Sequence, residues 1–204
     1  MRTSARAGFT LLELLLSLAI LSLITGSIVG GLHLGKRAFE TGKAYEEVNE
    51  VEEAARALAS QLASASAVYV TSPDKMQVVG FLGQPDGCRF LALSQGEAQW
   101  GGLVLTEIGG DETRADEIEV WTRAYRPSEG FSIARAAMSK TPILRNTAYF
   151  KLSYFGVIEK DHPPVWTDTW GFRDVSPLLV AATVGARRSG HVVDVSFTVA
   201  LPQR

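Results

Sequence analysis

Residues 8–34 read GFTLLELLLSLAILSLITGSIVGGLHL, and this stretch decides how the whole chain is organised. From Phe9 to Leu34 it is almost wholly apolar, interrupted by Thr, Ser, Gly, His33 and a single acid, Glu13. A helix rises about 1.5 Å per residue, so the run would be about 39 Å long, which exceeds a hydrocarbon core of about 30 Å. We therefore expect a membrane-crossing helix near the N-terminus.

Two ordinary interpretations of this helix leave something unexplained. The short basic segment before it would suit a secretory signal peptide, but the apolar run is long for one and carries an acid. A plain single-pass anchor explains the length but not Glu13, because a carboxylate inside a membrane costs roughly 2.5–3.5 kcal/mol on insertion scales. Lys36 and Arg37 follow the run, so basic residues on both flanks leave the positive-inside rule undecided.

The segment Gly8-Phe9-Thr10-Leu11-Leu12-Glu13, with a basic leader before it and the apolar run after it, resembles the class III signal of type IV pilins and type II secretion pseudopilins. The resemblance implies that a prepilin peptidase cuts after Gly8 on the cytoplasmic side and methylates the new N-terminus, Phe9. It also implies a single-pass protein of the inner membrane with its C-terminal domain in the periplasm, a substrate of that peptidase and not itself an enzyme.

Cleavage would give Glu13 an electrostatic partner. The new α-amino group of Phe9 is largely charged at neutral pH, and opposite charges attract more strongly in a medium of low dielectric constant. The Glu13 carboxylate can then neutralise the Phe9 amine of a neighbouring subunit and set the axial register between packed helices. The alternative is a protonated Glu13 at the membrane interface, near Phe9 of its own chain.

The helical pattern continues beyond the apolar run. Apolar residues recur in steps of three and four and define one helical face, formed by Tyr45, Val48, Val51, Ala55, Leu58, Leu62 and Ala65. The other face carries Glu46, Glu47, Glu50, Glu52 and Glu53, which we interpret as a solvated surface, with docking of basic residues from adjacent subunits as the alternative.

Glycines interrupt the helical region at several points. Gly26, Gly30 and Gly31 either permit close helix packing and local unwinding or are ordinary glycines of a membrane helix. Gly42 is expected to mark a bend between the two helical halves.

After Ser66 the period of the apolar residues changes to two, which indicates strands. The expected strands are residues 68–70, 76–82, 89–93, 103–108, 117–125, 148–157, 178–184 and 192–201, and a turn at 187–190 makes the last two a hairpin. A long helix packed on an antiparallel sheet would bury the apolar helical face, so we predict an α+β fold of pilin type. The expected segments are a leader at 1–8, a transmembrane assembly helix at 9–35, an amphipathic helix at 36–66 and a β-rich head at 67–204.

The C-terminal third carries a looser set of features. An aromatic strand at 150–155 is followed by Trp166-Thr167-Asp168-Thr169-Trp170, by Ser176-Pro177 before an apolar strand, and by a last strand that ends in Leu201-Pro202. This order is similar to minor pseudopilin J of type II secretion, although that family usually has Leu-Pro at the place of Ser176-Pro177. The loop between the tryptophans either contacts another protein or, as we favour, both rings complete the core of the sheet.

The resemblance to minor pseudopilin J implies a subunit of the pseudopilus tip, which primes polymerisation of the major pseudopilin for export of folded proteins across the outer membrane. The implied partners are the prepilin peptidase, the minor pseudopilins I, K and H, the major pseudopilin and the inner-membrane assembly platform, with secreted substrates as further candidates. A minor pilin of a type IV pilus, serving pilus assembly, adhesion or DNA uptake, is the alternative.

No pattern in the sequence points to catalysis, a cofactor or nucleic-acid binding. The formal net charge is −2 and there is no run rich in Lys and Arg. His33, His162 and His191 lack a second His or Cys at metal-ligand spacing. Five acids crowd one loop and strand, and calcium is conceivable there, but their spacing is not that of a known calcium loop. We interpret these acids as a solvated turn: Asp111, Glu112, Asp116, Glu117 and Glu119.

The single cysteine, Cys88, excludes an intramolecular disulfide. Its neighbours as far as Leu93 read as a strand, so we expect a buried small apolar residue rather than an exposed thiol.

Overall fold

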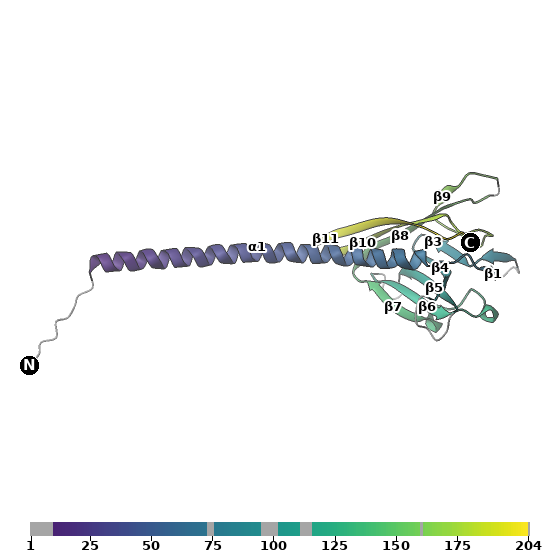
Figure 1. Ribbon diagram of the computed structural model, residues 1–204, viewed down its shortest axis with the longest axis horizontal. Coiled ribbons are helices and arrows are strands. Elements are labelled where there is room, and N and C mark those ends of the chain that lie inside the picture. Colours follow the sequence, from purple (N-terminus) through teal and green to yellow (C-terminus); the bar gives the residue numbers. More distant parts are fainter. Residues whose placement is uncertain (1–9, 73–75, 95–101, 111–115, 160, 204) are drawn as a thin grey trace, which may run out of the picture. The chain divides into compact units, whose positions relative to one another are not determined.

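The computed structural model describes residues 10–72, 76–94, 102–110, 116–159 and 161–203. The chain forms two compact units, Met1–Glu46 and Glu47–Arg204. Helix α1 (Leu11–Ala63) makes up the described part of the first unit and supplies the beginning of the second, while all the strands belong to the second unit (Figure 1).

Within the first unit, α1 is continuous through its glycines. Gly26, Gly30 and Gly31 are helical, and so are the residues on both sides of Gly42. The helix therefore does not break at Gly42, and the bend expected there stays a prediction. A glycine inside a helix costs only about 0.5–1 kcal/mol relative to alanine, which is too little to end a helix that its neighbours favour.

The described residues of the second unit form three antiparallel sheets, so the predicted α+β fold is confirmed (Figure 1). Two strands pair as β1-β2, five pair in the order β3-β4-β5-β6-β7, and four pair in the order β11-β10-β8-β9. The strands are β1 (Tyr69–Thr71), β2 (Gln77–Val79), β3 (Phe81–Gln84), β4 (Gly87–Leu93), β5 (Leu103–Gly110), β6 (Ile118–Ala124), β7 (Ser139–Leu144), β8 (Thr147–Gly156), β9 (Val165–Thr167), β10 (Leu179–Arg188) and β11 (His191–Ala200). Two short 3-10 helices, Pro127–Glu129 and Arg135–Ala137, lie between β6 and β7.

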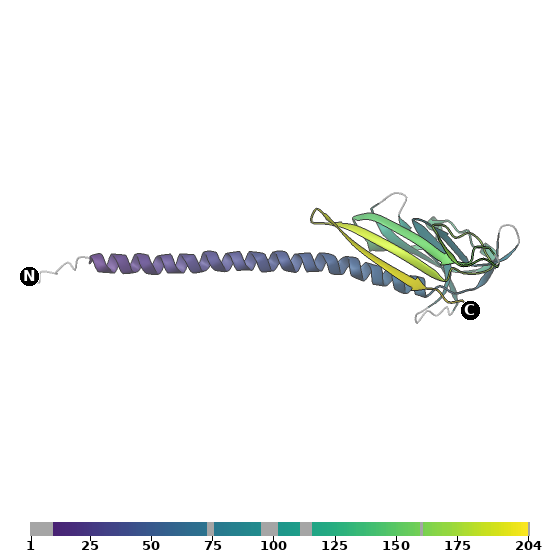
Figure 2. The same ribbon diagram turned by 90° about the horizontal axis from the view of Figure 1, so that it is seen from above.

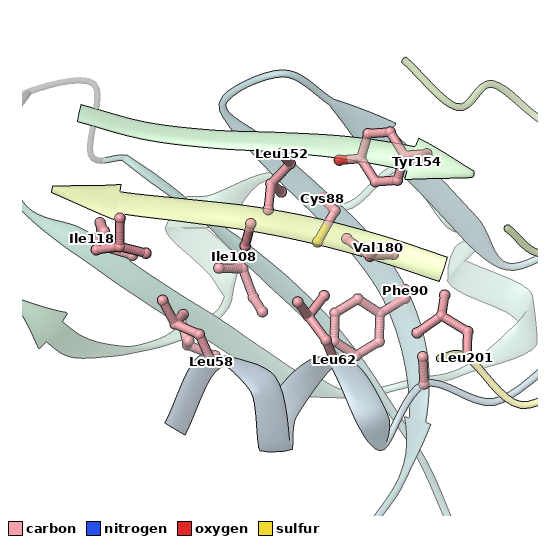
Figure 3. Packing of buried hydrophobic residues seen from close by; sticks show 14 of the residues in the cluster. Leu58, Leu62, Cys88, Phe90, Ile108, Ile118, Leu152, Tyr154, Val180 and Leu201 are labelled. Atoms are coloured by element: carbon pink, nitrogen blue, oxygen red, sulfur yellow. The ribbon is translucent and has the colours of Figure 1, made fainter. Parts of the chain in front are cut away.

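The main core of the second unit lies where the end of α1 meets the two larger sheets. Leu58 and Leu62 of α1 pack in one cluster with Phe90 of β4, Ile108 of β5 and Val180 of β10 (Figure 3), and each of these residues is at most 1% exposed. Full burial of such a side chain contributes about 1.5–3 kcal/mol. This packing explains why the last turns of α1 bind the sheets.

The predicted apolar face of the helix is only partly right. Val51, Ala55 and the residues that follow on the same face are buried, but Tyr45 is 68% exposed and Val48 is 38% exposed. Steps of three and four continue N-terminal to the region that the sheets cover, so periodicity alone does not show where burial begins.

A second apolar cluster covers the opposite face of the five-stranded sheet. Leu91, Leu105 and Trp121 project from β4, β5 and β6 and pack with Phe131 and Met138 from the segment between β6 and β7. Because both faces of this sheet are covered, five successive residues of β5 are buried instead of every second one.

The two larger sheets are joined at Gly83 of β3. The Gly83 N–H donates to the Trp170 carbonyl oxygen at 2.8 Å, and the Gly83 carbonyl accepts the Trp170 N–H at 2.9 Å. The ring of Tyr154 packs against Gly83, and a Cβ at this position would lie 2.4 Å from the ring. Only a residue without a side chain fits here.

Three strand predictions need correction. The expected strand at 76–82 is divided into β2 and β3 at Gly80, whose N–H donates to the Val68 carbonyl at 2.8 Å. β7 was not expected because it contains Pro142, which a sheet tolerates at an edge, and β7 is such an edge. β9 was not expected because it has only three residues and pairs only with the end of β8.

The predicted hairpin at the C-terminus is confirmed; β10 extends to Arg188, beyond the expected end at 184, while β11 has the expected length and begins one residue earlier. β10 and β11 pair from Leu179↔Ala200 to Arg188↔His191, and Figure 2 shows them in yellow beside each other. Ser189 and Gly190 form the turn with φ of 46° and 84°. Positive φ at both central residues is the geometry of a two-residue hairpin turn that matches the twist of the strands.

Candidate functional site

The predicted cleavage site, Gly8 and Phe9, lies outside the residues that the structure describes. Thr10 caps the start of α1: its carbonyl oxygen accepts the N–H of Glu13 at 3.1 Å and that of Leu14 at 3.2 Å. Its Oγ1 lies 3.3 Å from the Glu13 nitrogen and accepts the same N–H. A threonine at this position satisfies a donor that the helix leaves unpaired.

The predicted assembly residue, Glu13, lies in the first turn of α1 and is exposed. The N-terminal end of a helix carries a partial positive charge, which favours a carboxylate there. No lysine or arginine of the described chain forms an ion pair with Glu13, so pairing with the Phe9 amine of a neighbouring subunit stays a prediction.

The apolar part of α1 is covered by no other described element of the first unit. Leu11 is 81% exposed, Leu12 is 77% exposed and Leu23 is 72% exposed. Across the described residues, α1 is the one helix long and apolar enough to cross a membrane. Such a large apolar surface requires lipid or other apolar helices around it, so α1 could serve as a membrane anchor.

The hydroxyl side chains of α1 within the apolar run are satisfied by the helix itself. The hydroxyls of Ser17, Ser22 and Thr25 each donate at 2.8 Å to the carbonyl four residues earlier, and Ser27 does so at 2.9 Å. A hydroxyl left without a partner in an apolar medium costs several kcal/mol. Because these hydroxyls have internal partners, the run is suited to a medium without water.

The acidic face of α1 is not simply solvated within the second unit. Arg188 at the tip of the β10–β11 hairpin is 8% exposed in its side chain and binds Glu50 with two contacts, Nε–Oε2 at 3.0 Å and Nη2–Oε1 at 2.9 Å. The Ser189 hydroxyl donates to Glu47 Oε1 at 2.5 Å. Glu50 is exposed, as expected of a solvated face, and Glu47 is only partly buried, but both carboxylates also bind the hairpin to the helix.

The two tryptophans of the predicted loop differ in environment. Trp170 is 1% exposed, and its indole N–H donates to the Val175 carbonyl at 3.3 Å. Trp166 is 50% exposed and lies against Phe155, with ring centroids 5.2 Å apart. The prediction that both rings complete the core is right for Trp170 and wrong for Trp166, because β9 is an edge strand with an open side.

A charged cluster that the sequence analysis missed holds the segment between β6 and β7. Glu107 accepts Arg135 Nε at 2.7 Å and Arg89 Nε at 2.8 Å, and it is 8% exposed. The Arg135 guanidinium lies 4.1 Å from the Trp121 ring centroid and donates to the Gly110 carbonyl at 2.9 Å. The three charged groups satisfy one another and the backbone, so we interpret the cluster as structural.

The structure describes only part of the predicted acidic turn, since Asp111 and Glu112 lie outside the described residues. Glu119 is fully buried in β6, with Lys140 Nζ 2.7 Å from its Oε1, and the Glu117 side chain is 11% exposed. The interpretation as a solvated turn is wrong for these two carboxylates. Within the described ranges, no group of three or more His, Cys, Asp or Glu side chains is arranged to hold a metal ion.

Cys88 is a free, buried cysteine in the main core, as predicted. Burial raises the pKa of its thiol well above the ordinary value of 9.0, and the Glu107 charge adds to the increase. The nucleophilic form of cysteine is the thiolate, so this thiol is chemically inert in the folded protein.

Comparison with known families adds one finding. Residues 3–29 match the model of the prokaryotic N-terminal methylation motif, and the matched range includes Gly8, Phe9 and Glu13. No curated protein matches the chain.

Proposed function

We propose, on the premise that the methylation motif and the α+β architecture make this chain a type IV pilin-like protein, that it is a minor pseudopilin of type II secretion, most similar to the J subunit. The observation that supports the pilin-like class is the motif at residues 3–29, which includes the start of an apolar helix with internally satisfied hydroxyls. The finer assignment rests on the order of features in the C-terminal third of the sequence. The proposed role is that of a structural subunit and not of an enzyme.

The proposed maturation is one cut and one methylation. A prepilin peptidase removes the leader, residues 1–8, and methylates Phe9. Residues 9–35 then remain in the inner membrane as the assembly helix, and residues 36–66 continue as an amphipathic helix into the periplasmic head, residues 67–204. The chain joins minor pseudopilins I, K and H in the tip of the pseudopilus, which starts polymerisation of the major pseudopilin for export of folded proteins.

Glu13 has the electrostatic role in this assembly. Two unit charges 4 Å apart interact by about 1 kcal/mol in water and by about 4 kcal/mol at an effective dielectric constant of 20. The Glu13 carboxylate of one subunit and the methylated Phe9 amine of its neighbour therefore favour one axial register of the packed helices over others.

The processing step is tested by expressing the full chain with and without a prepilin peptidase and determining the N-terminal residue by mass spectrometry. We expect a methylated Phe9 only in the presence of the peptidase, and no cleavage in Gly8→Leu. Gly42→Leu is the matched control, because Gly42 is a helical glycine where an added Cβ would have nothing within 4 Å, and it should be processed normally. An intact Met1, or a cut beyond the apolar run, would contradict the proposal.

The assembly step is tested separately with Glu13→Gln, which removes the charge and keeps the shape. This variant should be cleaved normally but enter filaments at a level at least tenfold below the unmodified chain. Glu40→Gln is the control, since Glu40 is an exposed acid of the same helix whose ion pair with Lys36, at 3.8 Å, is worth little. Equal incorporation of both variants would rule out the role given to Glu13.

A minor pilin of a type IV pilus shares the same motif and is the alternative. A strain lacking this chain separates the two functions: loss of a folded exported protein from the medium supports the secretion pseudopilus. Normal export combined with loss of surface pili, adhesion or DNA uptake supports the type IV pilus.

A further inference from the structure

Among the described residues, the two larger sheets end in four edge strands, and three of these are protected against pairing with another chain. β7 carries Lys140 and Pro142 and shifts its register against β6, β9 has three residues, and β3 has four residues and is bonded to Trp170. Charged residues, above all lysine, together with proline, irregular register and short length are the usual protections of an edge.

The fourth edge strand, β11, has of these protections only a single carboxylate, Asp194. It is ten residues long, from His191 to Ala200, and contains no Pro, Lys, Arg or Gly. Its register with β10 has no shift along the whole strand. Figure 2 shows it as the outermost yellow strand of its sheet.

The hairpin turn determines which backbone groups of β11 face the open edge. The pair Arg188 and His191 closes a two-residue turn and is therefore hydrogen-bonded, so the odd-numbered residues of β11 bond to β10. The Leu201 N–H, which donates to the Leu178 carbonyl at 3.0 Å, continues this odd-numbered set. The even-numbered residues direct their N–H and C=O groups outward, and all five are exposed: Val192, Asp194, Ser196, Thr198 and Ala200.

The inner face of this sheet is less completely buried along β11 than along β10. The inward row of β10 is at most 2% exposed, and it consists of Val180, Ala182, Val184 and Ala186. The inward row of β11 packs against the same core but is only partly buried, and it consists of Val193, Val195, Phe197 and Val199. One more strand with apolar residues on this face would cover the second row.

The charge of β11 indicates which kind of strand could add at its open edge. Asp194 is the one carboxylate of β11, and it lies on the outward row. A cross-strand neighbour of opposite charge stabilises such a position, and a like charge destabilises it. A second copy of β11 has no Lys or Arg to place beside Asp194, so a different strand with a basic residue is the better match.

We propose that β11 is an acceptor edge for an extended strand of a neighbouring, non-identical pilin-like subunit. The incoming strand adds beside β11 to the sheet β11-β10-β8-β9, with apolar residues on the core side and a basic residue near Asp194. An unpaired ladder of alternating N–H and C=O groups is matched by an extended backbone and not by a helix. The inference rests on the proposed function, because it requires assembly with other subunits.

The test compares backbone amide exchange with deuterium in the full-length chain, first purified in detergent and then incorporated into assembled filaments. Exchange at the even-numbered amides of residues 192–200 should slow at least tenfold on incorporation, while exchange in β7, the protected edge, should stay the same. An incorporated chain with unchanged exchange in β11 overturns the inference but leaves the proposed function intact. A chain that never enters a filament overturns both, and slowing that depends on the concentration of the purified chain alone overturns the assignment to a non-identical partner.

Proline substitution provides a second readout. Ser196→Pro and Thr198→Pro each remove one N–H that faces the open edge and leave the bonds to β10 in place. Both variants should be cleaved at Gly8 and keep Cys88 inaccessible to a thiol reagent, which shows that they fold, yet their incorporation should fall at least tenfold. Folded variants that are incorporated like the unmodified chain would overturn the inference.

Discussion

Alanine at position 83 should destabilise the second unit even though it adds only one methyl group. The new Cβ would lie 2.4 Å from Tyr154 Cζ and 2.7 Å from both Cε atoms, whereas carbon atoms in contact lie about 3.5–4.0 Å apart. Tyr154 is fully buried and has little freedom to move, because its hydroxyl lies 2.8 Å from the Gln84 carbonyl oxygen and 3.1 Å from that of Gly87. Gly83 itself is held by its two backbone bonds to Trp170.

The magnitude follows from three opposing effects. Overpacking a core costs about 1–3 kcal/mol, and weakening a tyrosine hydrogen bond costs about 0.5–1.5 kcal/mol more. Replacing glycine by alanine within a strand returns about 0.5–1 kcal/mol of conformational free energy. The steric effect outweighs the conformational one, so the free energy of unfolding should fall by about 2–3 kcal/mol, or roughly 4–12 °C in melting temperature for a unit of this size.

The measurement is the unfolding of the full chain by guanidinium in detergent, with tryptophan fluorescence as the signal that reports unfolding. Gly171→Ala is the matched control, because it lies beside Trp170 but has nothing within 4 Å of the added methyl group, and it should stay within about 0.5 kcal/mol of the unmodified protein. Equal stability of the two variants would refute the reasoning, since it would mean that the Tyr154 ring moves aside without cost.

Three further results are expected. Arg188→Ala removes a nearly buried charged group with two contacts to Glu50 and should lower the free energy of unfolding by about 1.5–3 kcal/mol in chemical denaturation. Arg56→Ala, which removes one partner of an exposed ion pair, should lower it by at most about 1 kcal/mol. Equal losses in the two variants would contradict the assigned roles. Burial raises the pKa of Cys88 above its ordinary value of 9.0, so above about pH 9 only the unfolded chain loses this proton. The contribution of this thiol to stability is therefore complete below pH 9 and declines above it by up to about 1.4 kcal/mol per pH unit, and Cys88→Ala should reduce that slope in unfolding curves measured from pH 8 to 11. Trp170→Ala should cost about 3–5 kcal/mol in thermal unfolding, whereas Trp166→Ala should cost less than about 1 kcal/mol, and a reversed order would mean that Trp166 is the buried ring.

Sequence periodicity predicted the buried residues correctly where a helix or strand buries one face and exposes the other. The apolar steps from Val51 to Ala65 predicted the buried face of α1, and strict alternation predicted β11. The Ser-Gly pair at 189–190 predicted the hairpin, because glycine takes positive φ without strain. The same reasoning overlooked β7, since Pro142 weakens a strand signal that only the neighbouring β6 restores by pairing.

The functional residues also fall into two groups, those that a local sequence pattern indicates and those that depend on the folded structure. The segment from Gly8 to Glu13 is a local signal, and the family match supports the class of protein that it indicates, while cleavage after Gly8 and methylation of Phe9 stay predictions. The open edge of β11 was not predictable, because an edge is defined by the absence of a neighbouring strand and not by the residues of the strand itself.

The amino-acid sequence was sufficient for the N-terminal helix, the motif that precedes it and the helical face that binds the head, since each depends on residues a few positions apart. The long-range contacts that stabilise the head are apparent only in the folded chain. Glu50 and Arg188 are 138 residues apart, and Gly83 meets Trp170 and Tyr154 from three different segments. Contacts of this kind depend on how the sheets pack, and packing is a property of the whole folded chain that no local pattern of residues encodes.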